Sequence, residues 1–242
     1  MTKEILGIIP ARGGSKSIPR KNIKELCGKP LLAWTIEAAK SAGVFDRIIL
    51  TTDDQEIAAV GKQFGVEVPF MRPTDLARDH TPSLPVLQHA VSLLREQGGY
   101  QPDAVMLLQP TAPLRQPFHI REAAELFETS GADSVVSVVE IPEHFSPHWA
   151  VVTSDNGWAK LFSGSPIRRR IPRRQDFPNA CYSHNGAMYL FKTHFLFDPR
   201  EPSFYGERVR LYPMEKRYSV NVDGPDDWDE AERMMQRIKD KG

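Results

Sequence analysis

Through the first two-thirds of the chain, short apolar runs alternate with amphipathic segments, and this alternation limits the fold more than any other feature. Such alternation is the pattern of βαβ units. The predicted strands are Ile5–Pro10, Arg47–Thr52, Glu67–Phe70, Ala104–Gln109 and Asp133–Glu140. The predicted helices are Leu31–Ala42, Asp53–Phe64, Leu84–Gln97 and Phe118–Ser130. Strands that are buried on both faces and joined by helical crossovers predict an α/β fold with a doubly wound, mostly parallel sheet.

The pattern changes after the last of these strands. Residues 142–182 are rich in Pro, aromatic and Arg residues and have little helical period. This composition predicts either a loop-rich lid or an arm that packs on another subunit. Strand-like patterning returns at Ala187–Phe191 and Arg208–Met214, and Asp226–Lys239 has the period of an amphipathic helix. No inter-domain linker is evident, so residues 1–242 are predicted to form a single domain with residues 142–182, called the arm below, as an insertion.

Composition narrows the class of protein. Lys plus Arg and Asp plus Glu number 31 each in 242 residues, so the formal net charge is zero and no global field attracts nucleic acid or a membrane. The apolar stretches are shorter than the ~20 residues of a membrane helix, and the N-terminus lacks a secretion-signal pattern. The two cysteines lie outside any CxxC spacing, which fits a reducing compartment. We therefore expect a cytoplasmic protein without a nucleic-acid or membrane partner.

The most informative segment is the loop that follows the first predicted strand, Ile9–Asn22, with the sequence IPARGGSKSIPRKN. Open α/β sheets place their ligands where such strands end. Gly13 and Gly14 allow a tight turn that aims N–H groups into a concavity. The cations expected around it are Arg12, Lys16, Arg20 and Lys21. A loop of this kind suits a triphosphate, although its spacing fits neither a Walker A loop nor the dinucleotide fingerprint GxGxxG.

This loop resembles the signature loop of the CMP-sialic acid synthetases, the acylneuraminate cytidylyltransferases. Four later motifs match that family in the same order. They are Arg72-Pro73 with Leu76-Ala77 and Asp79, Leu107–Arg115 (LLQPTAPLR), Arg174-Gln175, and Asn185–Tyr189 (NGAMY). The resemblance implies a Rossmann-like nucleotidyltransferase fold with a small dimerisation arm. It also implies a Mg²⁺-dependent reaction, in which the anomeric hydroxyl of a nine-carbon 2-keto sugar acid attacks the α-phosphorus of CTP and diphosphate leaves.

The resemblance assigns roles within the nucleotide site. Arg12 and Lys21 are expected to contact the phosphates and to be catalytic together with Asp223, because phosphoryl-type transfer depends on positioning and charge neutralisation. The other residues expected to bind CTP are Ala11, Gly13, Gly14, Ser15, Lys16, Asn22, Arg72, Thr81 and Ser83. Arg72 and the backbone near Thr81 and Ser83 are expected to recognise the cytosine edge.

A magnesium site is expected in the segment Ser219–Gly224. Mg²⁺ takes hard oxygen ligands and is often held by one or two carboxylates plus phosphate oxygens. If the segment is a strand, Asn221 and Asp223 lie on the same face. Members of the family often have two aspartates here, whereas Asn221 brings an amide oxygen without charge. Asp223 is therefore the expected metal ligand, and Asn221 a weaker or water-mediated one.

A second set of residues is expected to bind the sugar acid. By this resemblance, Gln109, Arg174 and Tyr189 correspond to residues that contact the sugar in the family. Phe204 and Tyr205 match an aromatic pair that reaches into the partner subunit's site. This match implies a homodimer with a composite active site.

Several alternatives are left open by the sequence. Legionaminic or pseudaminic acid could replace N-acylneuraminate, whereas an eight-carbon ketodeoxyoctonate is disfavoured because the enzymes that activate it have a different first loop. A catalytically inactive nucleotide-binding regulator is favoured only by Asn221. An NAD-dependent oxidoreductase is rejected because this sequence lacks the glycine fingerprint of such enzymes. The basic run Arg168–Arg174 contains no aromatic residue that would stack on a base.

Overall fold

The structure, a computed structural model, describes residues 4–239. Its centre is a six-stranded sheet with the order β10-β6-β9-β5-β1-β4. These strands are β1 (Ile5–Pro10), β4 (Arg47–Thr51), β5 (Ala104–Leu107), β6 (Ser134–Glu140), β9 (Tyr182–Lys192) and β10 (Val209–Pro213). All neighbouring pairs are parallel except those of β9, which runs antiparallel between β5 and β6. The expectation of a mostly parallel sheet is confirmed.

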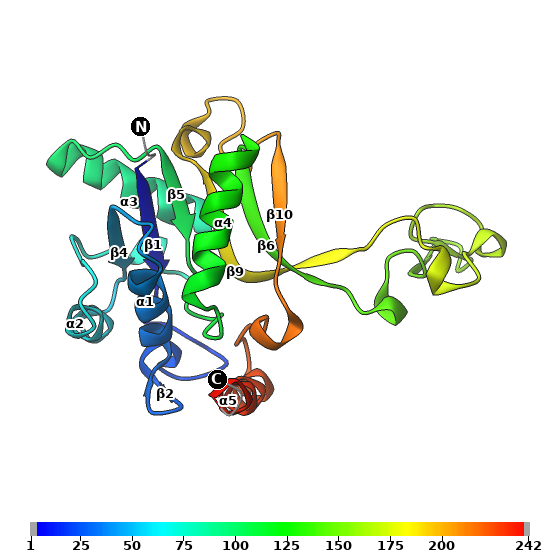
Figure 1. The fold of residues 1–242 in the computed structure, drawn as a ribbon, viewed down its shortest axis with the longest axis horizontal. Coiled ribbons are helices and arrows are strands. Elements are labelled where there is room, and N and C mark those ends of the chain that lie inside the picture. Colours follow the sequence, from blue (N-terminus) through cyan, green and yellow to red (C-terminus); the bar gives the residue numbers. More distant parts are fainter. Residues whose placement is uncertain (1–3, 240–242) are drawn as a thin grey trace.

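Helices cover both faces of this sheet (Figure 1). They are α1 (Leu31–Ala42), α2 (Gln55–Gln63), α3 (Ser83–Gly98) and α4 (Pro117–Ser130), whereas α5 (Pro225–Lys239) lies beyond the end of the sheet. Strand β1 shows why both faces must be covered, because its side chains alternate between two cores. Ile5 and Ile9 pack with residues of α1, α2 and α4, whereas Leu6 and Ile8 pack with residues of α3. The doubly wound arrangement follows from this alternation.

The predicted helix ends are marked by local signals. Helix α1 ends at Gly43, whose φ of 68° places it in the left-handed region that favours glycine. Helix α2 begins after Asp54, whose side chain accepts hydrogen bonds from the backbone N–H groups of Glu56 and Ile57. Helix α5 packs through Trp228 and Met235 against Ile18 of the loop that follows β1. The C-terminal helix therefore supports the loop predicted to bind phosphate.

Two predicted strands are absent, and one prediction was too long. Glu67–Phe70 meets the edge strand β4 through the isolated bridge Ile49–Glu67, and a second isolated bridge, Thr52–Met71, joins the residues that follow the two segments, so no ladder forms. Ser219–Gly224 is an irregular segment between a 3₁₀ turn and α5. It crosses the end of the sheet instead of extending it, and Val222 N donates to Thr111 O at 2.7 Å. Strand β5 ends at Leu107, so Gln109 lies in the loop beyond it.

The arm leaves the sheet after β6 and returns as β9, and it extends far from the rest of the chain (Figure 1). It contains a small antiparallel pair, β7 (Val151–Thr153) and β8 (Ala159–Leu161). A second small pair, β2 (Glu25–Leu26) and β3 (Lys29–Pro30), precedes α1. Three aromatic side chains of the arm are exposed, with Phe145 at 70%, Trp158 at 76% and Phe162 at 67%. The segment projects outward from the sheet (Figure 1), and its packing on another subunit stays a prediction.

No helix within residues 4–239 has the length and apolar character needed to cross a membrane.

Candidate active site

A cleft of about 380 Å³ opens where β1 and β5 end, between the loop that follows β1 and the segment that precedes α5. Its lining residues are Pro10, Arg12, Gly14, Ser15, Lys16, Ser17, Lys21, Asn22, Arg72, Gln109, Pro110, Thr111 and Asp223. A smaller cavity of about 70 Å³ shares Pro10, Arg12 and Arg72 with the cleft and is also lined by Thr81 and Ser83. Most of the residues predicted to bind CTP therefore surround one hollow at the expected edge of the sheet.

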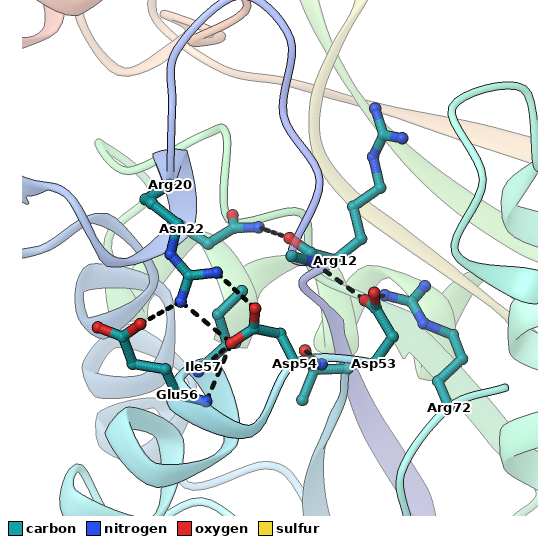
Figure 2. Close-up of polar contacts among 10 residues, drawn as sticks. Arg12, Arg20, Asn22, Asp53, Asp54, Glu56, Ile57 and Arg72 are labelled. Carbon is teal, nitrogen blue, oxygen red and sulfur yellow. Dashed lines mark hydrogen bonds and ion pairs between the residues drawn. The ribbon is translucent and has the colours of Figure 1, made fainter. Parts of the chain in front are cut away.

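The loop is held at its start by three polar contacts. Ala11 is buried, and its N–H donates to Thr51 O at 3.0 Å. Gly13 N–H donates to Asp53 Oδ1 at 3.0 Å, and Asn22 Nδ2 donates to the Arg12 carbonyl at 2.9 Å. Figure 2 shows the last two of these contacts, at the Asp53 carboxylate and at the Arg12 backbone. The Gly13 amide is thus directed at Asp53 and away from the cleft, whereas Gly14 lines the cleft.

Three of the four loop cations named above reach the cleft. Arg12 and Lys16 both form ion pairs with Asp79. The Lys21 ammonium donates to Val222 O at 2.9 Å and lies 3.9 Å from Asp223 Oδ1. Burial lowers the pKa of Lys21, and the Asp223 carboxylate partly offsets this effect. The expectation that Arg20 surrounds the same concavity is wrong, because its guanidinium binds Asp54 and Glu56 outside the cleft (Figure 2).

Arg72 is a buried cation without a close carboxylate. Its side chain is only 4% exposed, and its Nη2 lies 3.8 Å from Asp53 Oδ1. Its Nε and Nη2 groups find no hydrogen-bond acceptor among the residues that the structure describes. Burial is the main reason that its pKa is lowered. Arg72 lines both hollows, so its guanidinium places a buried positive charge in the wall that they share.

Asp223 is oriented by its neighbours. Asn221 Nδ2 donates to Asp223 Oδ2 at 2.7 Å, and Ser17 Oγ donates to the Asp223 carbonyl. Asp227 fixes the backbone, since its Oδ2 accepts from Asp223 N at 2.9 Å and from Gly224 N at 2.7 Å. Although the segment is not a strand, Asn221 and Asp223 lie side by side as predicted.

The residues around Asp223 fit a hard cation only in part. Among residues 4–239, no three or more His, Cys, Asp or Glu side chains gather as a metal site would require. The Asp223 carboxylate lines the cleft, and the buried Asn221 Oδ1 accepts no hydrogen bond from the described part of the chain. One carboxylate and one amide oxygen suit Mg²⁺ when phosphate oxygens and water complete the shell.

Gln109, Gly186 and Asn221 lie close together in the region where the sugar acid is predicted to bind. A Cβ atom on Gly186 would lie 2.8 Å from Gln109 Oε1 and 3.2 Å from Asn221 Oδ1. Arg115 supports this region from the core, because its Nη1 donates to Ala187 O at 2.5 Å and to Gln109 O at 3.4 Å. The fold therefore brings the expected sugar contact Gln109 next to the expected metal segment.

The other predicted sugar residues lie outside the cleft. Tyr189 packs against Phe204 and Tyr205, with ring centroids 5.6 and 6.2 Å apart, and against His184 at 6.0 Å. Burial raises the pKa of Tyr189 to about 12. Arg174 belongs to the arm, where it forms an ion pair with Glu143. The reach of the aromatic pair and of Arg174 into another subunit stays a prediction.

Sequence reasoning assigned Asp53 and Asp54 only to the start of a helix and did not connect them to the site. Both lie directly after β4, where a parallel strand meets the ligand edge of the sheet. That position was the signal that could have found them.

Comparisons with known proteins identify the family of the chain. The family model described as cytidylyltransferase matches residues 6–239. The chain is 35% identical to the CMP-N,N'-diacetyllegionaminic acid synthase of Legionella pneumophila over 96% of both chains. It is 34% identical to the N-acylneuraminate cytidylyltransferase of Oncorhynchus mykiss and 35% identical to that of Streptococcus agalactiae. The match covers 98% and 91% of this chain but only 51% of each of those two relatives.

Solved structures show the same fold. A CMP:2-keto-3-deoxy-manno-octonic acid synthetase in complex with CTP matches with a TM-score of 0.68 at 20% identity, over 97% of this chain and 99% of that one. A 4-diphosphocytidyl-2C-methyl-D-erythritol synthase from Anaerococcus prevotii matches with a TM-score of 0.64 at 14% identity, over 98% and 97%. The family model spans nearly the whole chain, and a relative of equal length is more than one-third identical. The chain therefore belongs to the cytidylyltransferase family, whose members are nucleotidyltransferase enzymes.

Proposed function

We propose that this enzyme transfers CMP from CTP to the anomeric hydroxyl of a sialic-acid-type, nine-carbon 2-keto sugar acid and releases diphosphate. The observation that supports this most strongly is the cleft, whose lining brings the cations Arg12, Lys16, Lys21 and Arg72 together with the carboxylate of Asp223. The names of the relatives support an N-acylneuraminate or a legionaminate as the sugar acid. Legionaminate is the second candidate because the relative of equal length has that substrate in its name.

In this proposal the cations of the loop bind the triphosphate. Arg12 and Lys16 are held by the exposed Asp79 carboxylate in the ligand-free chain, and the phosphates would replace that carboxylate. Lys21 is held in place by the Val222 carbonyl, so its charge is positioned before the substrate arrives. Positioned cations stabilise charge that develops in the transition state without reorganising during the reaction.

Cytosine recognition is proposed for the smaller cavity. Arg72 lines this cavity, and its guanidinium would donate to the acceptors on the cytosine edge. Thr81 and Ser83 line the same cavity and would supply backbone groups to the base. The Ser15 and Gly14 positions complete the phosphate side of the cleft.

A divalent cation, Mg²⁺, is proposed to bind at Asp223. When bound, it would neutralise phosphate charge and lower the pKa of the attacking hydroxyl. The Asp223 carboxylate would hold it, and Asn221 could add its Oδ1 as a neutral second oxygen only after its amide, whose Nδ2 donates to Asp223, rotates. The Asp227 contacts to the Asp223 and Gly224 backbone would keep the carboxylate at the cleft in the absence of the ion.

Sugar recognition is proposed to involve Gln109 within the chain and a second copy of the chain. The exposed arm aromatics would contact that copy, and Arg174, Phe204 and Tyr205 would then act on the sugar in a composite site of a homodimer. Sedimentation of the wild type as a monomer at micromolar concentration would argue against this arrangement. We place the reaction in the cytoplasm, which cell fractionation tests.

The test of the proposed function is diphosphate release from CTP across a panel of sugar acids, with and without Mg²⁺. The panel contains N-acetylneuraminate, N,N'-diacetyllegionaminate, pseudaminate and ketodeoxyoctonate. The proposal expects release with the first or second sugar acid and only with the metal. Binding of CTP without release for any sugar acid would instead indicate a regulator.

A further inference from the structure

Arg20 has a backbone conformation that is rare for its residue type. Its φ of 55° and ψ of 30° are left-handed, a region that side chains other than glycine, Asn and Asp seldom occupy. The next residues form the 3₁₀ turn Lys21–Ile23, which directs Lys21 to Val222 and Asn22 to Arg12. The direction of two cleft-lining side chains thus depends on the φ angle of Arg20.

The Arg20 side chain is anchored on the far side of the loop from the cleft. Its Nη1 donates to Asp54 Oδ2, and its Nη2 donates to Asp54 Oδ1 at 3.1 Å and to Glu56 (Figure 2). These hydrogen bonds raise the pKa of Arg20 and lower that of Asp54. The Asp54 side chain is only 20% exposed. A partly buried bidentate pair has a fixed geometry, in contrast to a single surface ion pair.

Asp54 also limits the other end of the loop. A Cβ atom on Gly13 would lie 2.7 Å from Asp54 Oδ2, so the loop backbone approaches this carboxylate as closely as glycine allows. The neighbouring Asp53 accepts the Gly13 N–H. Asp53 and Asp54 therefore contact the loop at Gly13 and at Arg20. The part of the loop that is proposed to face the phosphates lies between these two loop residues.

We propose that Arg20 and Asp54 are positioning residues that hold the loop in its binding conformation, and that Arg20 is not a phosphate ligand. The inference rests on the proposed CTP site. The ion pair keeps Arg20 in the left-handed region. When the pair is lost, Arg20 relaxes to negative φ, and the turn that directs Lys21 and Asn22 into the cleft rotates with it.

The test compares Arg20→Gln with Arg20→Gly. Both variants lack the guanidinium, but glycine adopts positive φ without strain and glutamine does not. We expect Arg20→Gln to weaken CTP binding about tenfold, equivalent to about 1.4 kcal/mol, which is near the cost of one left-handed residue. Arg20→Gly is expected to stay within about threefold of the wild type. The measurement is isothermal titration calorimetry of CTP with the full-length protein.

Asp54→Asn provides the second arm. Asparagine keeps an oxygen for the backbone N–H groups of Glu56 and Ile57, so α2 keeps its cap, but the charge that holds Arg20 is removed. We expect a loss of CTP affinity similar to that of Arg20→Gln, and a double variant no weaker than either single variant, since both changes break one interaction. In steady-state kinetics the KM for CTP should rise more than kcat falls.

The matched control is Arg47→Gln. Arg47, the first residue of β4, forms a comparable pair with Glu67 through its Nε and Nη2, but it does not line the cleft. This variant should bind CTP like the wild type, and thermal unfolding of each variant checks that it folds.

Equal loss of CTP affinity in Arg20→Gly and Arg20→Gln would overturn the inference and assign Arg20 to the phosphates. Unchanged affinity in Asp54→Asn would overturn it as well. A wild-type protein that binds no CTP would instead overturn the proposed function and the inference with it.

Discussion

Gly186 offers a sharp test of how the site is assembled. It lies in β9 next to the point where the pairing of β6 and β9 shifts register between Val136 and Val138. Its φ is 71°. In Gly186→Ala, the new Cβ would lie 2.8 Å from Gln109 Oε1 and 3.2 Å from Asn221 Oδ1. The change therefore combines backbone strain with crowding of two predicted site residues.

The two effects have different sizes and different readouts. The positive φ should lower the free energy of unfolding by about 1–2 kcal/mol, which for a domain of this size lowers the Tm by about 2–8 °C. The crowded atom at 2.8 Å is the end of the Gln109 side chain, which rotates away at little further cost. Losing one hydrogen bond between Gln109 and the sugar acid should raise the KM for the sugar acid about tenfold, which is equivalent to about 1.4 kcal/mol of binding free energy. CTP affinity should stay within about twofold, because Gly186 does not line the cleft.

The matched control for this change is Gly131→Ala. Gly131 has a φ of 63°, and a Cβ there would have no heavy atom within 4 Å, so this variant reports the strain alone. Differential scanning calorimetry and initial rates at varied sugar acid separate the two effects. If both variants have the wild-type KM for the sugar acid, the proposed role of Gln109 is refuted.

Three further outcomes are expected. Arg12→Ala should lower turnover about 100-fold with an unchanged Tm, and wild-type rates of diphosphate release would contradict its phosphate role. Asn221→Asp should preserve or raise Mg²⁺ affinity in calorimetric titrations with CTP present, and a collapse of that affinity would show that the amide itself is needed. Burial lowers the pKa of His119 from 6.5 to about 4. Because the unfolded chain takes up this proton first, the free energy of unfolding should fall by up to about 3 kcal/mol as the pH drops from about 6.5 to 4. Urea unfolding at pH 7 and pH 4.5 should show a smaller fall in the free energy of unfolding for His119→Gln than for the wild type. An equal fall in the two proteins would rule out His119 as the cause.

Local patterns predicted the parts of the fold that depend on neighbours in the sequence. The β1 prediction was correct to the residue, because a strand buried on both faces is an unbroken apolar run. The end of α1 was found through Gly43, which acts within one helical turn, whereas α2 begins at Gln55, two residues later than predicted, because Asp54 is its N-cap. The antiparallel direction of β9 was not predicted, because alternation does not reveal which strands pair. Glu67–Phe70 has strand-like residues but meets β4 at single points only.

The type of site was predictable from the sequence, but the direction in which each side chain points was not. Glycines and cations after the first strand identified the phosphate loop. Arg20 and Lys21 are adjacent and have the same charge, yet one faces Asp54 and the other faces the cleft. What separates them is a left-handed φ and an acid that follows a different strand, and neither can be read from the loop itself. The proximity of Gln109 to Asn221 likewise depends on the close approach at Gly186.

The pairing of Glu140 with Tyr182 has a consequence for how the arm relates to the sheet. The arm begins and ends at facing positions of two adjacent antiparallel strands, so it is topologically the connection of an ordinary β-hairpin. A tight turn in its place would leave the order and direction of all the central strands unchanged. Lengthening, trimming or replacing this excursion is therefore compatible with the same central sheet, and a chimaera with another protein's arm needs only two junctions.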